Sequence, residues 1–285
     1  MATKLNIAVI GAGGKMGMRV SPNLASHPEY NVKFCEAGEA GIKRSEEAGR
    51  PITPTPEAVK DADIVVYAVP DRALNKITTE IVPLQKPDSV VLTLDPAAAY
   101  ANQLFIRDDL TYIVCHPAHP SVFLERKTDE EYADTFGGVA AAQHVLAAMD
   151  TESEKWQPIG EEVIANMFAP VVAVHWESVH DLAVLEPTLN ETIGCMIGQF
   201  LKDVLDYTVE VTDMKYESVE AMFFGHIFIA LTNALRGSNP FSDACLLAMD
   251  YGRERIINPN WKEVFKDEDL DIVLAKMLEL DKIER

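Results

Sequence analysis

One stretch decides the fold of this chain: Ile7-Ala8-Val9-Ile10-Gly11-Ala12-Gly13-Gly14-Lys15-Met16-Gly17. An apolar run of strand type leads directly into a turn with four glycines, and the sequence after the turn favours a helix. Such a turn lets the backbone approach a diphosphate, whose charge the free N–H groups and dipole of the helix N-terminus stabilise. The alternative is an ordinary strand-to-helix turn. We interpret Gly11 to Gly17 as a dinucleotide-binding segment.

Working outward, similar apolar runs recur at Val32–Cys35, Ile64–Val69, Val90–Leu94 and Tyr112–Val114, with helix-like segments between them. Continuous rather than alternating apolar runs are typical of strands that are buried on both faces of a parallel sheet. The fold class predicted is α/β, with an N-terminal Rossmann-type doubly wound parallel sheet followed by a mostly α-helical C-terminal domain.

The second apolar run ends in Glu36, nineteen positions after Gly17. An acidic side chain at this place accepts hydrogen bonds from the adenosine ribose hydroxyls and repels a 2′-phosphate, which favours NAD over NADP. Lys43 and Arg44 follow and could soften this preference, although a helix surface is their simpler role. We therefore predict NAD as the cofactor.

Other polar residues follow the later strands, at the carboxyl edge where ligands of such sheets bind. Asp71 comes after Pro70 and is predicted to lie beside the cofactor, although it could also cap a helix. His116 and His119 lie in the segment Cys115-His-Pro-Ala-His-Pro120. Two histidines on a short rigid loop suit proton transfer or cation binding, and a purely structural role is the alternative.

The second half of the chain contributes Glu186, which lies in an apolar stretch and precedes Pro187. Proline kinks a helix and frees backbone carbonyls, and a carboxylate buried there needs a partner. That partner could be a metal ion, a substrate hydroxyl or an arginine. Glu191 is a further candidate ligand. His226, among apolar helix residues, is expected to be structural or at a dimer interface.

The alternation of apolar strand-type runs and helix-like segments ends after Pro120. From Glu177 onward most of the chain is predicted to be amphipathic helix. We predict a cofactor-binding domain over residues 1–120 and a helical substrate and dimerisation domain over 121–285. The long helices expose more apolar surface than one small domain can cover, so a homodimer through the second half is expected.

Composition excludes several classes of protein. The 45 Asp and Glu residues outnumber the 25 Lys and Arg residues, and a formal charge of −20 disfavours nucleic acid and anionic lipid. The four cysteines form no CxxC pair, which indicates a reduced, cytoplasmic protein. The most apolar stretch, Ala221 to Leu235, is expected to be too short to span a membrane.

Together these features resemble the 6-phosphogluconate and prephenate dehydrogenase superfamily. The resemblance rests on the glycine turn with Lys-Met-Gly, the strand Ala-Asp-Ile-Val-Val-Tyr-Ala-Val-Pro, the His-Pro segment and the helical second half. Within the superfamily, the segments His-Pro-Ala-His-Pro and Leu-Ala-Val-Leu-Glu-Pro look most like the D-apionate oxidoisomerase group. The Lys and Asn pair of the hydroxyacid dehydrogenases has no counterpart near residues 166 to 200.

This resemblance implies an NAD-dependent oxidation of a branched sugar acid, a small hydroxycarboxylate, followed by an α-ketol rearrangement. It implies His116 and Glu186 as catalytic residues and as ligands of a divalent cation, with His119 and Glu191 as further ligands. It also implies that residues Gly11, Ala12, Gly13, Gly14, Lys15, Met16, Gly17, Glu36 and Asp71 bind the cofactor. The alternatives are a metal-free prephenate- or hydroxyacid-type dehydrogenase and a non-catalytic NAD-binding sensor.

Overall fold

The computed structural model describes residues 4–284. Contacts divide the chain into two compact units, one formed by residues 4–186 with 271–284 and the other by Pro187–Leu270. The predicted boundary at residue 120 lies inside the first unit, because the sheet continues beyond it. Residues from the C-terminal end of the chain also belong to this first unit.

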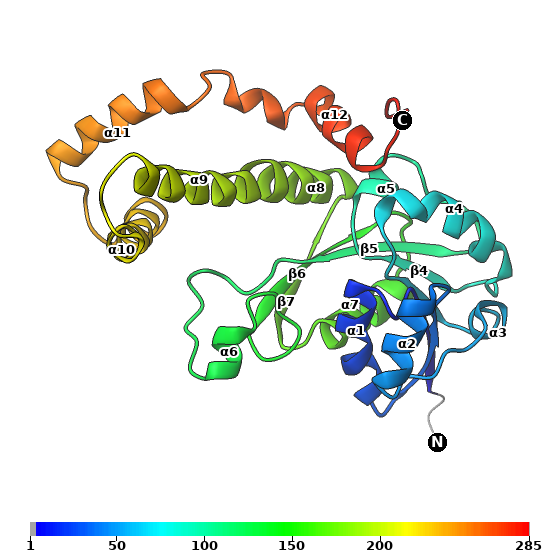
Figure 1. The fold of residues 1–285 in the computed structure, drawn as a ribbon. Helices are drawn as coiled ribbons and strands as arrows, with labels where there is room; N and C mark the ends of the chain where they lie inside the picture. Colours follow the sequence, from blue (N-terminus) through cyan, green and yellow to red (C-terminus); the bar gives the residue numbers. More distant parts are fainter. Residues whose placement is uncertain (1–3, 285) are drawn as a thin grey trace. The chain divides into compact units, whose positions relative to one another are not determined.

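The first unit is built on a seven-stranded sheet of order β2-β1-β3-β4-β5-β6-β7 (Figure 1). Strands β1 to β5 are parallel, β6 is antiparallel to β5, and β7 is parallel to β6. The strands are β1 (Leu5–Ile10), β2 (Tyr30–Cys35), β3 (Ile64–Tyr67), β4 (Val90–Thr93), β5 (Thr111–Pro117), β6 (Gln143–Met149) and β7 (Val171–Glu177). The doubly wound α/β prediction is confirmed.

Helices lie between these strands, and one more helix follows the last strand. They are α1 (Lys15–Ser26), α2 (Glu39–Glu47), α3 (Thr55–Val59), α4 (Asp71–Ile81), η1 (Val82–Leu84), α5 (Ala97–Tyr100), α6 (Asp129–Ala133), α7 (Trp156–Met167) and α8 (Val179–Ala183). Every residue of β3 and β4 is buried, as the continuous apolar runs predicted. Their side chains form one core with those of β1 and α7, such as Val163 and Met167.

The second unit is helical. It contains most of η2 (Val184–Cys195), then α9 (Met196–Glu210), α10 (Tyr216–Arg236), α11 (Asp243–Ile256), η3 (Trp261–Phe265) and the start of α12 (Asp267–Met277). Its buried aliphatic side chains are Leu205, Val219 and Leu270, whereas many others are exposed. The remainder of α12 packs within the first unit through Leu274 and Leu278.

Helix α10 corrects one expectation. The apolar stretch extends into a helix of 21 residues with a mean hydropathy of 1.4 over 18 of them, so its length and composition suffice for a membrane span. The apolar stretch predicted from the sequence was too short because it began at Ala221, whereas the helix begins at Tyr216. Only 6% of that window is buried. A single helix of this kind is weak evidence for a span, because an apolar interface helix has the same composition.

Candidate active site

The glycine turn has the geometry that its sequence predicted. Gly11 adopts a positive φ of 77°, which a residue with a side chain rarely adopts. A Cβ on Gly17 would lie 2.1 Å from the Gly11 carbonyl oxygen, so only glycine lets α1 start this close to β1. Gly14 precedes the first residue of α1 and leaves free N–H groups at the helix N-terminus. The segment can therefore hold a diphosphate.

Glu36 lies at the end of β2, directly beside this turn. Its Oε2 accepts a hydrogen bond of 3.0 Å from the Gly13 N–H, and its Oε1 accepts bonds from the N–H groups of Ala37 and Gly38. The Arg44 side chain donates a 2.8 Å bond to the Gly13 carbonyl oxygen, so Arg44 supports the turn. A carboxylate thus lies where an adenosine ribose would bind.

A pocket of about 340 Å³ adjoins these residues. Gly11, Glu36 and Val69 line it together with apolar side chains such as Ile77 and Leu84. Apolar walls with two carboxylates, those of Glu36 and Glu80, suit an adenosine group, whose base is flat and whose ribose carries hydroxyls. The pocket supports the cofactor-binding prediction for the glycine turn and Glu36.

Three side chains come together at the carboxyl edge of the sheet, namely Asp95, His116 and Glu186. Each offers one ligand atom, and these atoms lie within 4.8 Å of one another. His116 Nδ1 is 3.5 Å from Asp95 Oδ2, and His116 Nε2 is 3.8 Å from Glu186 Oε1. Two carboxylates and one imidazole are a donor set that fits a divalent cation.

Hydrogen bonds fix which nitrogen of His116 carries the proton in the neutral ring. Nδ1 lies 3.1 Å from the Leu94 carbonyl oxygen, which can only accept, so Nδ1 is the donor. Nε2 then presents its lone pair toward Glu186. Burial lowers the pKa of His116, but the hydrogen bond and charge of Asp95, together with the charge of Glu186, outweigh burial and raise this pKa above its usual value.

His119 lies beside this cluster, with its ring centroid 6.0 Å from that of His116. Its backbone adopts a positive φ of 59°, and its Nδ1 bonds the Phe136 carbonyl oxygen at 2.8 Å. Burial lowers the pKa of His119, and the charges of Arg19 and Lys15 lower it further, although the hydrogen bond to Phe136 acts in the opposite direction. His119 is therefore a neutral imidazole at pH 7, with Nε2 available as an acceptor.

Glu186 reaches this site from the π-helix η2. Pro187 within η2 cannot donate a backbone hydrogen bond, and a π-type turn is a common way for a helix to accommodate such a break. The predicted irregularity next to Pro187 is thus present. Glu186 is 6% exposed, so its carboxylate is shielded from solvent. A buried carboxylate needs a positively charged partner, so Glu186 is well placed to bind a cation or a proton beside His116.

The structure therefore brings His116 and Glu186 together and adds Asp95, which the sequence did not single out as a site residue. Asp71 is the first residue of α4, at the carboxyl end of β3, and its contact with a cofactor stays a prediction. Glu191 belongs to the second unit, and its role as a ligand also stays a prediction. His226 is exposed on α10, where its Nδ1 bonds the Met222 carbonyl oxygen.

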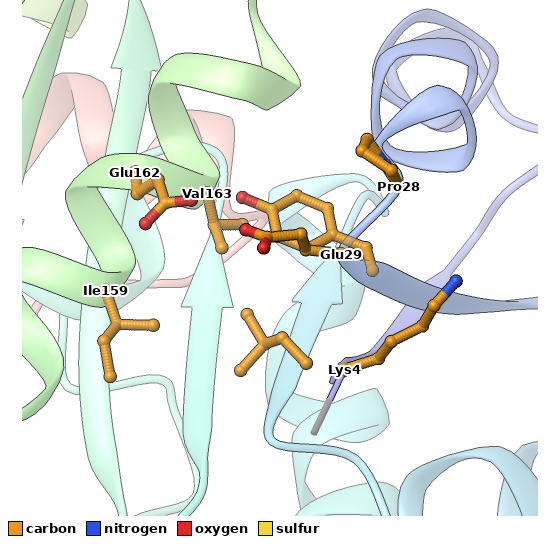
Figure 2. A pocket seen from close by; sticks show the side chains of 8 residues that line it. Lys4, Pro28, Glu29, Ile159, Glu162 and Val163 are labelled. Atoms are coloured by element: carbon orange, nitrogen blue, oxygen red, sulfur yellow. The ribbon is translucent and has the colours of Figure 1, made fainter. Parts of the chain in front are cut away.

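A second pocket lies at the opposite, amino-terminal edge of the sheet and has a volume of about 420 Å³. Figure 2 shows Glu29 and Glu162 pointing into it beside Ile159 and Val163 of α7. Ligands of open α/β sheets bind at the carboxyl edge instead. Asp95, His116 and Glu186 therefore remain the candidate active site, and we assign no role in it to this pocket.

Comparison with known proteins agrees with this architecture. Residues 1–150 match the family model for the NADPH-binding domain of acetohydroxy acid isomeroreductase. Residues 124–278 match that for the C-terminal domain of decarboxylating phosphogluconate dehydrogenase. Among solved structures, a semialdehyde dehydrogenase NAD-binding protein from Cupriavidus necator, in complex with calcium and NAD, superposes with a TM-score of 0.91. It is 36% identical, and the match covers 97% of this chain and 100% of that one.

Two curated relatives are similar over essentially their whole length. The D-apionate oxidoisomerase of Pectobacterium atrosepticum is 49% identical over 286 residues, covering 100% of both chains. The D-apionate oxidoisomerase of Blautia hydrogenotrophica is 38% identical and covers 98% of both. The present chain therefore belongs to the D-apionate oxidoisomerase family of oxidoreductases.

Proposed function

We propose that this enzyme oxidises D-apionate, a branched sugar acid, with NAD and rearranges the product to 3-oxo-isoapionate with the help of a divalent cation. The convergence of Asp95, His116 and Glu186 at the carboxyl edge of the sheet carries the proposal. The 49% identity to a D-apionate oxidoisomerase supports the substrate. The Cupriavidus relative, whose complex contains calcium and NAD, supports both cofactors.

The residues present fit both groups. NAD would lie on the Gly11 to Gly17 turn with its ribose at Glu36, where it would accept a hydride from the C2 carbinol of the substrate. Asp95, His116 and Glu186 would hold the cation, which would polarise the substrate oxygens and stabilise charge that develops on them. The Glu36 carboxylate would accept hydrogen bonds from the ribose hydroxyls and repel a 2′-phosphate, which favours NAD over NADP.

The reaction needs an acceptor for the C2 hydroxyl proton. Nε2 of His116 has one lone pair, so His116 accepts the proton only when no cation occupies that nitrogen. With a cation bound there, the neutral His119 is the remaining imidazole beside the site. In the second step the hydroxymethyl group migrates from C3 to C2. The C3 hydroxyl loses its proton and becomes a ketone, while the C2 oxygen gains a proton.

The experiment is to incubate the protein with NAD and a panel of branched and linear aldonates, with added cation or with EDTA. We expect NADH formation on D-apionate, a rearranged product identified by NMR, and loss of activity with EDTA that added cation restores. Full activity after chelation with an unrearranged 2-keto acid would instead establish the metal-free dehydrogenase. NAD binding without turnover on any aldonate would establish the sensor.

We further propose that the enzyme is a homodimer that associates through residues 187–270. This unit buries few aliphatic side chains, while Met222, Phe228 and Leu247 are 65%, 54% and 72% exposed. A second copy that covers α10 would explain an apolar helix of this length better than a membrane span. The four cysteines are free thiols, which supports a reducing, cytoplasmic location.

A further inference from the structure

A cavity of about 680 Å³ lies between helix α1 and the segment 134–139. Lys15 and Arg19 line it from the helix, and Phe136 and Gly138 line it from the segment. Both cations lie over the Phe136 ring, with Lys15 Nζ and Arg19 Cζ each 4.6 Å from the ring centroid. A pocket with two cations is notable in a chain of net charge −20, because it offers an anion a local attraction.

The segment that forms one wall is held rigidly by Asp134. This buried carboxylate accepts hydrogen bonds from the backbone N–H groups of Gly137, Val139, Ala140 and Ala141. It also forms an ion pair of 2.6 Å with Arg19. The charge of Arg19 is therefore largely compensated by Asp134, which shapes the pocket wall.

Lys15 differs from Arg19 in this respect. Within residues 4–284 the lysine ammonium has no carboxylate partner within ion-pair distance, and it lies against the face of Phe136. A ring face attracts a cation but leaves its charge uncompensated. The four-carbon stem of lysine is flexible, so the ammonium can move to a nearby anion while the helix stays fixed.

Two ring contacts lead from the Phe136 wall of this pocket toward the candidate active site. The Phe136 ring centroid is 4.5 Å from that of His119, which in turn is 6.0 Å from that of His116. Lys15 and Arg19 are close enough to His119 to disfavour its charged form. A ligand at the Asp95, His116 and Glu186 cluster can thus extend toward Lys15.

We propose that Lys15 binds the carboxylate of the substrate and selects aldonates over uncharged sugars, an inference that rests on the proposed function. The rearrangement exchanges charge between the oxygens of C2 and C3, so these two oxygens belong at the cation cluster. The C1 carboxylate then projects from the opposite side of C2 and needs a separate positive group. Lys15 is the cation at this site that is free to supply it.

The same lysine is also at the start of α1, so the diphosphate of the cofactor is the competing anion. The backbone N–H groups at the N-terminus of α1 would hold a diphosphate without this side chain, and the lysine ammonium rests on the Phe136 side. The two roles predict different losses. A carboxylate ligand predicts weaker substrate binding with unchanged NAD affinity, whereas a diphosphate ligand predicts weaker NAD binding.

The test compares Lys15→Met with the wild type and with Lys60→Met, in which an exposed lysine at the end of α3 is removed. We expect Lys15→Met to raise the KM for D-apionate roughly 10- to 100-fold, the usual weight of a hydrogen bond to a charged group. We expect kcat and the Kd for NAD, measured by fluorescence, to change by less than about threefold, and Lys15→Arg to recover part of the loss. Lys60→Met should match the wild type.

Apionamide, the uncharged amide of the substrate, provides a second readout, because its KM should not respond to Lys15→Met. An unchanged KM for D-apionate, or a Kd for NAD that weakens as much as this KM, would overturn the inference. Should the wild type turn over no aldonate, the proposed reaction fails. Calorimetric titration of D-erythronate into the NAD complex would then still decide whether Lys15 binds a carboxylate.

Discussion

The two units of this chain differ in how much of their apolar surface they bury. In the first unit the side chains of β1, β3 and β4 are buried within its own core. In the second, helix α10 has a comparable apolar content but leaves residues such as Phe224 and Phe228 more than half exposed. The first unit therefore buries its own apolar surface, whereas the second leaves an apolar surface exposed for the second copy that we propose.

The largest expected effect tests whether the chemistry belongs to the first unit. His116→Ala should lower kcat/KM about 10²- to 10⁴-fold, the range expected for the loss of a proton acceptor or cation ligand. Secondary structure by circular dichroism and dimerisation should be unchanged, because His116 lies at the sheet edge. A variant that keeps more than a tenth of the wild-type activity would contradict this placement of the site.

A smaller effect tests the second unit. Phe228→Asp places a charge in the proposed interface and should weaken dimerisation roughly 100-fold or more, as for a central aromatic of an interface. Analytical ultracentrifugation at several protein concentrations measures this. Glu47→Gln, which changes an exposed carboxylate of α2 in the first unit, is the control. Unchanged association of Phe228→Asp, or a wild type that is monomeric at every concentration, would show that a second copy does not cover α10.

The parts of the fold that the sequence predicted are those whose side-chain pattern is local. Continuous apolar runs identified β1 to β5, because burial on both faces leaves no alternation. Helix α7 was missed because Pro158 and Gly160 interrupt its helical pattern. The start of strand β6 at Gln143 depends on a non-local contact, because Asp134 binds the N–H groups of the preceding segment.

The site was predictable to the extent that its residues carry a local signal. His116 and Glu186 stood out beside prolines, whereas Asp95 becomes informative only with the strand register. Thr93 pairs with Val114 in the parallel ladder, and continuing this register by two residues places Asp95 opposite His116. The sequence Leu94-Asp95-Pro96 at the end of β4, next to β5, was the local signal that could have indicated Asp95. The contact of Lys15 with Phe136 could not be predicted, because Phe136 lies 121 residues further along the chain.

A third prediction concerns how pH changes the affinity of the proposed cation site in the first unit. A protonated His116 cannot be a ligand, and the pKa of His116 is raised because Asp95 and Glu186 outweigh the effect of burial. Below this raised pKa a proton competes with the cation, so affinity for Mn²⁺ should fall by about tenfold per pH unit. Calorimetry between pH 8.5 and 5.5 measures this. Phe228→Asp should show the same profile, since the cluster lies within one unit, and His116→Gln should lose it.

The smallest expected effect concerns how the C-terminal segment is attached to the first unit. Glu279 forms an ion pair of 2.5 Å with Arg72, but both side chains are more than half exposed, at 65% and 60%. Exposed pairs contribute only about 0.2–1 kcal/mol, because water and salt screen them. Glu279→Gln should therefore lower the free energy of unfolding, measured in urea, by less than about 1 kcal/mol. Glu47→Gln, which breaks the exposed pair with Lys43, is the control. A loss of about 2 kcal/mol or more would show that charge attaches this segment. The small loss that we expect would show that burial of Leu274 and Leu278 attaches the C-terminal segment. The first unit would then hold this distant segment through its own core.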